Sequence, residues 1–200
     1  MRTSHKEMRR KINAEVSKIT DEELFSSAAF AAYLTDIAEA VTKRYKRKLR
    51  VETIYDTSEN AMIACTNNRN ILINTGNYIS QSMPYRKLKA ESILGLVGHE
   101  VGHMLFTNFR ISETYFSELS YGRLYPQMEL SEEEQESFTE VTDYFKTGTE
   151  EQKQAILKAA KLLLNILEDA YIEARICDRY TGRFATGIHL NNIRFTEMMP

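Results

Sequence analysis

The sequence predicts an α+β protein in which a small, mainly antiparallel sheet is followed by helices. Two observations support this class: long stretches have apolar residues every three or four positions, and three short β-type runs lie within residues 51–75. With 42% apolar and 27% charged residues, the 200-residue chain can bury a core. We therefore expect a single domain over residues 1–200, with N-terminal helices over residues 1–48.

The clearest N-terminal helix is predicted from Ser27 to Lys48, where an Ala-rich run has apolar residues at helical spacing. Short strand-like runs are predicted at Val51–Asp56, Ala61–Thr66 and Ile71–Asn74. In the first of them Val51, Thr53 and Tyr55 alternate with polar neighbours, as in a half-buried strand. Residues 67–70 are rich in Asn, which tolerates a positive φ, so we expect a hairpin turn between the last two strands.

A long helix is predicted over residues 84–108, opened by Pro84, which is well placed in a first helical turn. The segment 109–130 is aromatic, and Gly122 and Pro126 favour an irregular structure.

Two further helices are predicted in the C-terminal half. The first covers Glu132–Phe145, with Ser131 as its N-cap and Glu134 at the capping-box position. The second is the longest of the chain, over residues 150–179, and Thr181-Gly182 ends it.

Several classes of protein are excluded or disfavoured. No apolar run is long enough to cross a bilayer, and no secretory signal is visible, so we expect no membrane partner. Cys65 and Cys177 lie outside any CxxC pattern, which favours a reducing, cytoplasmic location. The net charge of -2 disfavours a nucleic-acid partner, and the basic cluster between Lys43 and Arg50 is expected to be a solvated helix end. A DNA-associated protein that uses this cluster remains the third hypothesis.

The most specific pattern is His99-Glu100-Val101-Gly102-His103. Positions i and i+4 of a helix share a face, so both imidazoles can reach one metal ion. Glu100 projects beside that ion, where a carboxylate can take a proton from water. In a random order of these residues, this pattern would occur about 0.01 times. We therefore predict that His99 and His103 bind metal and that Glu100 is the general base.

This motif resembles that of the HExxH zinc metallopeptidases, the zincins. The resemblance implies a zinc ion on His99 and His103, with Glu100 as catalytic base. The metzincin branch of this family is excluded, because metzincins continue the motif with Gly and a third His, and this chain has Phe106 and Phe109 at those two positions. The third ligand must therefore lie elsewhere in the chain.

The third-ligand helix is predicted to be the one over residues 150–179, because carboxylates set into an apolar helix need a metal, a counter-charge or water. Its run around Asn165, Glu168 and Asp169 resembles the second helix of gluzincins, which supplies a Glu ligand. That family often has Asp four residues after the ligand, whereas this chain has Ile172 there. We favour Glu168 as ligand with Asp169 orienting a histidine; alternatively, Asp169 is the ligand and Glu173 orients a histidine.

Two residues are candidate oxyanion donors by analogy with gluzincins, which use a downstream His or Tyr: His189 and Tyr171. For both, a surface or packing role is the simpler interpretation. Peptide deformylases use an upstream Cys as a metal ligand, but the neighbours of Cys65 do not match their motif. We therefore expect Cys65 to be a buried structural thiol.

The leading hypothesis is a zinc-dependent metallopeptidase of the gluzincin type, acting on a peptide or protein substrate. The substrate would pair with an exposed strand edge, either Ala61–Thr66 or Ile71–Asn74. The alternative is a catalytically inactive metallopeptidase-like binding or regulatory module. The two helices together also resemble a group of bacterial and phage proteins that carry such a region beside a von Willebrand A-like module, which implies such a module as partner or as a missing C-terminal part.

Overall fold

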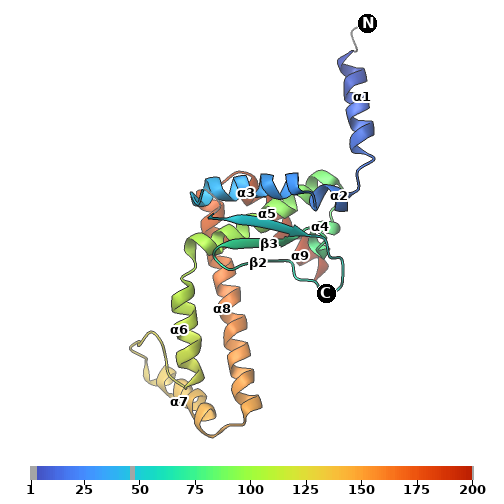
Figure 1. Cartoon of the computed structure of the whole chain (residues 1–200). Helices are drawn as coiled ribbons and strands as arrows, with labels where there is room; N and C mark the ends of the chain where they lie inside the picture. Colours follow the sequence, from blue (N-terminus) through green and yellow to red (C-terminus); the bar gives the residue numbers. More distant parts are fainter. Residues whose placement is uncertain (1–3, 46–47, 200) are drawn as a thin grey trace. The chain divides into compact units, whose positions relative to one another are not determined.

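The computed structural model describes residues 4–45 and 48–199, which are mostly helical with one small sheet (Figure 1). Two residues of the predicted basic cluster, Lys46 and Arg47, lie outside the described residues. Within the described ranges, we find no helix with the length and apolar character that a membrane crossing requires. The elements are α1 (His5–Val16), α2 (Asp21–Phe25), α3 (Ala28–Thr42), β1 (Arg50–Ile54), β2 (Ala64–Thr66), β3 (Asn70–Asn74), α4 (Tyr78–Gln81), α5 (Arg86–Phe106), α6 (Phe109–Ser120), α7 (Glu132–Thr147), α8 (Glu150–Arg179) and α9 (Arg183–Met198). The α+β class is confirmed.

The chain divides into two compact units. One unit comprises Met1–Leu105 with Glu173–Pro200, and the other comprises Phe106–Ile172. The first contains the sheet and the helix with the HExxH motif, and α8 passes from the second unit into the first as one continuous helix. The expectation of one domain over residues 1–200 stays a prediction.

The sheet is mixed, with strand order β1-β3-β2, so the expectation of a mainly antiparallel sheet was wrong. β1 pairs with β3 in parallel, and β2 pairs with β3 in antiparallel fashion. Alternation of apolar residues shows which face a strand buries but not its direction, which is why the sequence did not reveal the parallel pair. The predicted hairpin turn is confirmed between β2 and β3, where Asn68 has a φ of 64°.

The end of β3 is fixed by a fully buried side chain, that of Asn74. Its amide oxygen accepts hydrogen bonds from the backbone N–H groups of Asp56 and Gly76, and its amide nitrogen donates to the carbonyls of Asp56 and Met62. A buried amide whose donors and acceptor are all used holds its neighbours in one arrangement. Asn74 thus fixes the segment that leads into β2.

Helix α3 covers the sheet from the side of β1 (Figure 1). Ser27 caps its first turn as predicted, but the helix ends at Thr42 and not at Lys48, because Lys43 adopts a left-handed conformation with a φ of 57°. The Thr35 hydroxyl, on the face toward the sheet, accepts a hydrogen bond from the backbone N–H of Val51.

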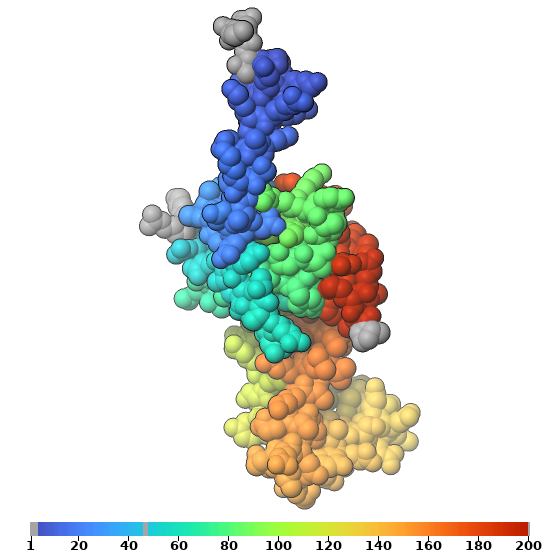
Figure 2. Space-filling model, turned by 90° about the vertical axis from the view of Figure 1, so that its right-hand side faces the viewer, coloured from blue at the N-terminus to red at the C-terminus, as the bar shows by residue number. Residues whose placement is uncertain are grey.

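Helices α5 and α9 pack closely in the first unit, and Figure 2 shows α9 (red) against the green segment that includes the start of α5. A Cβ atom added at Gly95 or at Gly187 would collide with the backbone of the other helix, so neither position has room for a side chain. Asn191 of α9 donates a hydrogen bond to the buried carbonyl of Ser92. α5 begins two residues after the predicted start, and α9 was not predicted, because Gly187 interrupts its buried apolar stripe.

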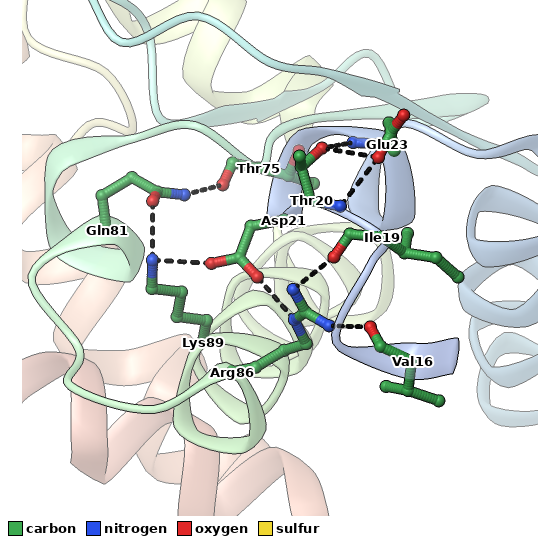
Figure 3. A network of polar contacts seen from close by, with 9 residues as sticks. All are labelled: Val16, Ile19, Thr20, Asp21, Glu23, Thr75, Gln81, Arg86 and Lys89. Carbon is green, nitrogen blue, oxygen red and sulfur yellow. Dashed lines mark hydrogen bonds and ion pairs between the residues drawn. The ribbon is translucent and has the colours of Figure 1, made fainter. Parts of the chain in front are cut away.

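A charged network connects the start of α5 with the end of α1, the start of α2 and the segment between them (Figure 3). The carboxylate of Asp21 accepts hydrogen bonds from Arg86 at 2.6 Å and from Lys89 at 2.8 Å. Arg86 also donates to the carbonyls of Val16 and Ile19. Burial raises the pKa of Asp21, but hydrogen bonds from Lys89 and Arg86 outweigh it, so this pKa lies below its ordinary value of 3.8.

The second unit is helical throughout its regular elements. The capping box of Ser131 and Glu134 at the start of α7 is confirmed, and α8 has the predicted bounds. The expectation of an irregular segment over residues 109–130 was wrong for its first half, which forms α6. Gly122 and Pro126 come after the end of α6, so they end this helix and do not prevent it.

Candidate metal centre

The two histidines of the HExxH motif lie one turn apart near the C-terminal end of α5. Their ring centroids are 4.9 Å apart, and the ring planes are inclined by 75°. Most residues around them on α5 are buried, whereas His99 and His103 are half-buried. This confirms that the helix presents both imidazoles on one face, as the i, i+4 spacing predicts.

The orientation of His99 is set by Glu173 of α8. The Nδ1 atom of His99 lies 2.9 Å from Oε1 of Glu173, and the other carboxylate oxygen of Glu173 accepts a hydrogen bond from Asn192 of α9 at 2.7 Å. A carboxylate bonded to Nδ1 favours the tautomer with its proton on Nδ1, so that Nε2 is the atom that would bind a metal ion. His99, Glu173 and Asn192 all belong to the first unit.

The third group beside the histidines is Asp169. Nitrogen atoms of His99 and His103 and a carboxylate oxygen of Asp169 all lie within 4.8 Å of one another. Asp169 is four residues before Glu173 on the same continuous helix, so the two carboxylates project from nearly the same face. The contact of Glu173 with His99 therefore also fixes the direction in which Asp169 projects.

Glu168, the ligand favoured from the sequence, is not a member of this cluster among the described residues. It is five residues before Glu173, so it projects about 140° away from Glu173 around the helix. The structure instead has the geometry of the alternative assignment, with Asp169 as ligand and Glu173 orienting a histidine. Asn165 and Tyr171, also on α8, are exposed, and His189 is exposed on α9.

Glu100 is 5% exposed, so its carboxylate lies in a largely desolvated position next to His99 along α5. Partial desolvation of its sulfur raises the pKa of the Cys65 thiol, although the residue as a whole is exposed, and the negative charge of Glu100 raises this pKa further. Cys65 is on β2, so this interaction places the Glu100 carboxylate within electrostatic range of that strand.

The neighbouring strand β2 is at an edge of the sheet, because β3 is paired on both sides. Of the two strand edges considered from the sequence, only the one around Ala64–Thr66 is therefore open to pairing. Cys65 is exposed, so the expectation of a buried thiol was wrong, and it is not a member of the cluster with the histidines in the described part of the chain.

Arg44 holds the C-terminal end of α5, a role that the sequence did not indicate. Its guanidinium donates to the carbonyl of Met104, next to His103, and to the backbone and side-chain oxygens of Asn68 in the β2–β3 turn. The last carbonyls of a helix have no partner within the helix, and a cation is favourable there. The only sequence signal was the basic cluster, which we interpreted as a solvated helix end.

The donor set fits a zinc ion. Two imidazoles and one carboxylate are ligands that Zn²⁺ prefers, and three protein ligands leave a fourth position for water or substrate, as in catalytic sites. Structural zinc sites are usually closed by four protein ligands. Comparison of this chain with protein-family models, with curated proteins and with solved structures finds no significant match.

Proposed function

We propose that this protein is a zinc-dependent peptidase in which His99, His103 and Asp169 hold the metal and Glu100 is the general base. The observation that carries the proposal is the convergence of three ligand-type groups within 4.8 Å, beside a glutamate that is almost fully buried. Asp169 here takes the place that gluzincins fill with Glu.

A zinc ion bound to these groups supplies Lewis acidity, which lowers the pKa of water and polarises a carbonyl group. Oε atoms of Glu100 accept a proton from the attacking water and return it to the amine that leaves, which is general acid–base catalysis by one side chain. Glu173 holds the His99 ring through Nδ1, and Asn192 holds the second oxygen of Glu173. One ligand, His99, is thus positioned by its neighbours before substrate binds.

A peptide is the substrate class that the surroundings favour. An edge strand has a row of backbone groups that pair with an extended peptide, and β2 is such a strand within electrostatic range of Glu100. A peptide on this edge would pass close to the base.

The test is cleavage of a fluorescence-quenched peptide library by zinc-loaded protein. Glu100→Gln should retain zinc and lose activity by about 100-fold or more, because proton transfer is lost while the ligands stay. The matched control Glu168→Gln should keep both zinc and activity.

Cleavage by Glu100→Gln at the wild-type rate would refute the mechanism. Zinc binding by the wild type without any cleavage would instead support the alternative, a metal-binding module without hydrolytic activity.

A further inference from the structure

The open edge of β2 lies between two loops of opposite charge. β2 is an outer strand of the sheet, on the side away from α3 (Figure 1). The turn after β2 contains Arg69 and is bonded by Arg44. The loop before β2, residues 55–63, contains Asp56 and Glu59 and no cation. An extended chain on this edge would therefore have cations at one end and carboxylates at the other.

The backbone groups of Ala64 and Thr66 face the open edge. On either side of them, the carbonyl of Ile63 and the N–H of Asn67 are hydrogen-bonded to the backbone of β3. Backbone groups of successive residues point to opposite sides of a strand, so those of Ala64 and Thr66 point away from β3. These two residues offer N–H donors and carbonyl acceptors to a chain that pairs with β2.

The basic end of the edge is formed by Arg44 and Arg69. The guanidinium of Arg44 donates to the backbone and side-chain oxygens of Asn68, which keeps its positive charge at the turn. Arg69 is held in the same turn through its backbone N–H, which donates to the side chain of Asn67, and the residue is exposed. Residues 67–70 contain no carboxylate, so the turn is a positively charged end.

The acidic end is held close to the start of β2. The buried amide of Asn74 donates to the carbonyls of both Asp56 and Met62, which keeps the backbone of residue 56 beside the residues that lead into β2. Asp56 and Glu59 are both exposed. A carboxylate oxygen of Asp56 accepts a hydrogen bond from the backbone N–H of Ser58, which favours its charged form.

The two charged ends are separated by a length that suits a short peptide. Six residues of extended chain, as over residues 62–67, span about 20 Å. Cys65 lies within this span, and its electrostatic interaction with Glu100 places the proposed base near the same part of the edge. A peptide of six to eight residues would therefore reach both charged ends while its middle lies near Glu100.

We propose that the edge of β2 selects peptides with acidic residues in the N-terminal half and basic residues in the C-terminal half. This inference rests on the proposed peptidase function and names the substrate class. Antiparallel pairs are more stable and more common than parallel ones. A peptide antiparallel to β2 has its N-terminal half at the turn with Arg69 and its C-terminal half at the loop with Glu59. Opposite charges then meet at both ends.

Two quenched fluorescent peptides of identical composition test the proposal with zinc-loaded protein. One has two Asp residues before a central segment of four uncharged residues and two Lys residues after it; in the other, the Asp and Lys pairs are exchanged. The first should have a kcat/KM about 10-fold higher, mostly through KM, since exposed charge pairs each contribute little and four of them change sign. The preference should decrease with added salt.

A double variant tests whether the two loops cause the preference. In Arg69→Glu with Glu59→Lys, the remaining charges of Arg44 and Asp56 are each cancelled, so the two peptides should be cleaved equally. The matched control is Arg9→Glu with Glu22→Lys, which makes the same charge changes at exposed residues of α1 and α2 and should keep the preference. Circular dichroism confirms that both variants are folded.

Binding of the same peptides to zinc-loaded Glu100→Gln, measured by fluorescence anisotropy, separates this inference from the proposed chemistry. Selective binding of the first peptide without cleavage by the wild type would refute the peptidase and support the charge preference. Cleavage of both peptides with equal kcat/KM would overturn the inference and leave the peptidase in place. Binding of neither peptide, or equal binding of both, would also overturn the inference.

Discussion

The hydrogen bond between Glu173 and His99 provides the most quantitative prediction. Glu173→Gln replaces a carboxylate with an amide of almost the same size, so the Nδ1–H group keeps an oxygen acceptor but loses the negative charge. That charge makes the imidazole a stronger ligand. Both side chains are only 22% exposed, so water and salt screen their interaction less than they screen a surface pair.

The expected loss of zinc affinity follows from the effect that such carboxylates have in other metal sites. Removing a carboxylate that orients a metal-binding histidine lowers metal affinity by about 10- to 100-fold, or about 1.4–2.8 kcal/mol. Asn192→Ala should have a smaller effect, because Glu173 loses one hydrogen bond through its second oxygen but keeps its charge and its contact with His99.

The assay is competition for zinc between the protein and a chromophoric chelator at neutral pH. Glu168→Gln is the matched control, since Glu168 is on the same helix but projects about 140° away from Glu173. The affinity of this control should equal that of the wild type. The reasoning is refuted if Glu173→Gln binds zinc as tightly as the wild type does.

Three further predictions concern the scaffold of the site. Arg44→Ala removes the cation at the C-terminal end of α5, and the free energy of unfolding in urea should fall by about 1–2 kcal/mol, with weaker zinc binding. The pKa of Asp21 is lowered in the folded protein, so its ion pairs stabilise the fold above pH 4, and this stabilisation is lost as the pH falls through the folded pKa. In Asp21→Asn the urea midpoint should therefore depend less on pH in this acidic range than it does in the wild type. Gly95→Ala should lower the melting temperature by an amount that corresponds to about 1–3 kcal/mol, since its Cβ would meet the backbone of Gly187.

Each of these variants has a control. Lys48→Ala removes an exposed cation of the same basic cluster and should leave the stability unchanged. Glu22→Gln, next to Asp21 but exposed, should keep the wild-type acid dependence. A Cβ at Gly182 would meet no atom within 4 Å, so Gly182→Ala should cost less than Gly95→Ala. If a variant behaves like its control, the contact that the variant removes or disturbs does not contribute to the stability of the folded protein.

Local sequence signals predicted the elements that depend on local chemistry. The spacing of His99 and His103 indicated a shared face of α5 because helix geometry alone decides it. The Ser131 cap and the bounds of α8 were also correct, since side chains within one turn determine a capping box and a long periodic pattern identifies a helix.

Features that depend on tertiary packing could not be predicted from local sequence signals. Whether Glu168 or Asp169 contacts the histidines depends on the rotation of α8 about its own axis. This rotation is set by the tertiary contacts of the whole helix. Ile172 and Ile176 are fully buried, but Asp169 and Glu168 project about 40° and 60° from the middle of that face, on opposite sides, so the apolar pattern of α8 does not choose between them. The parallel pairing of β1 with β3 likewise depends on the path of the chain between the strands.

A crystal structure of the zinc-loaded protein is the most direct test of the metal centre. The anomalous difference map should show one zinc peak about 2.0–2.2 Å from nitrogen atoms of His99 and His103 and from a carboxylate oxygen of Asp169, with Glu173 still bonded to Nδ1 of His99. A peak coordinated by Glu168 in place of Asp169, or no peak between the two histidines, would contradict the account.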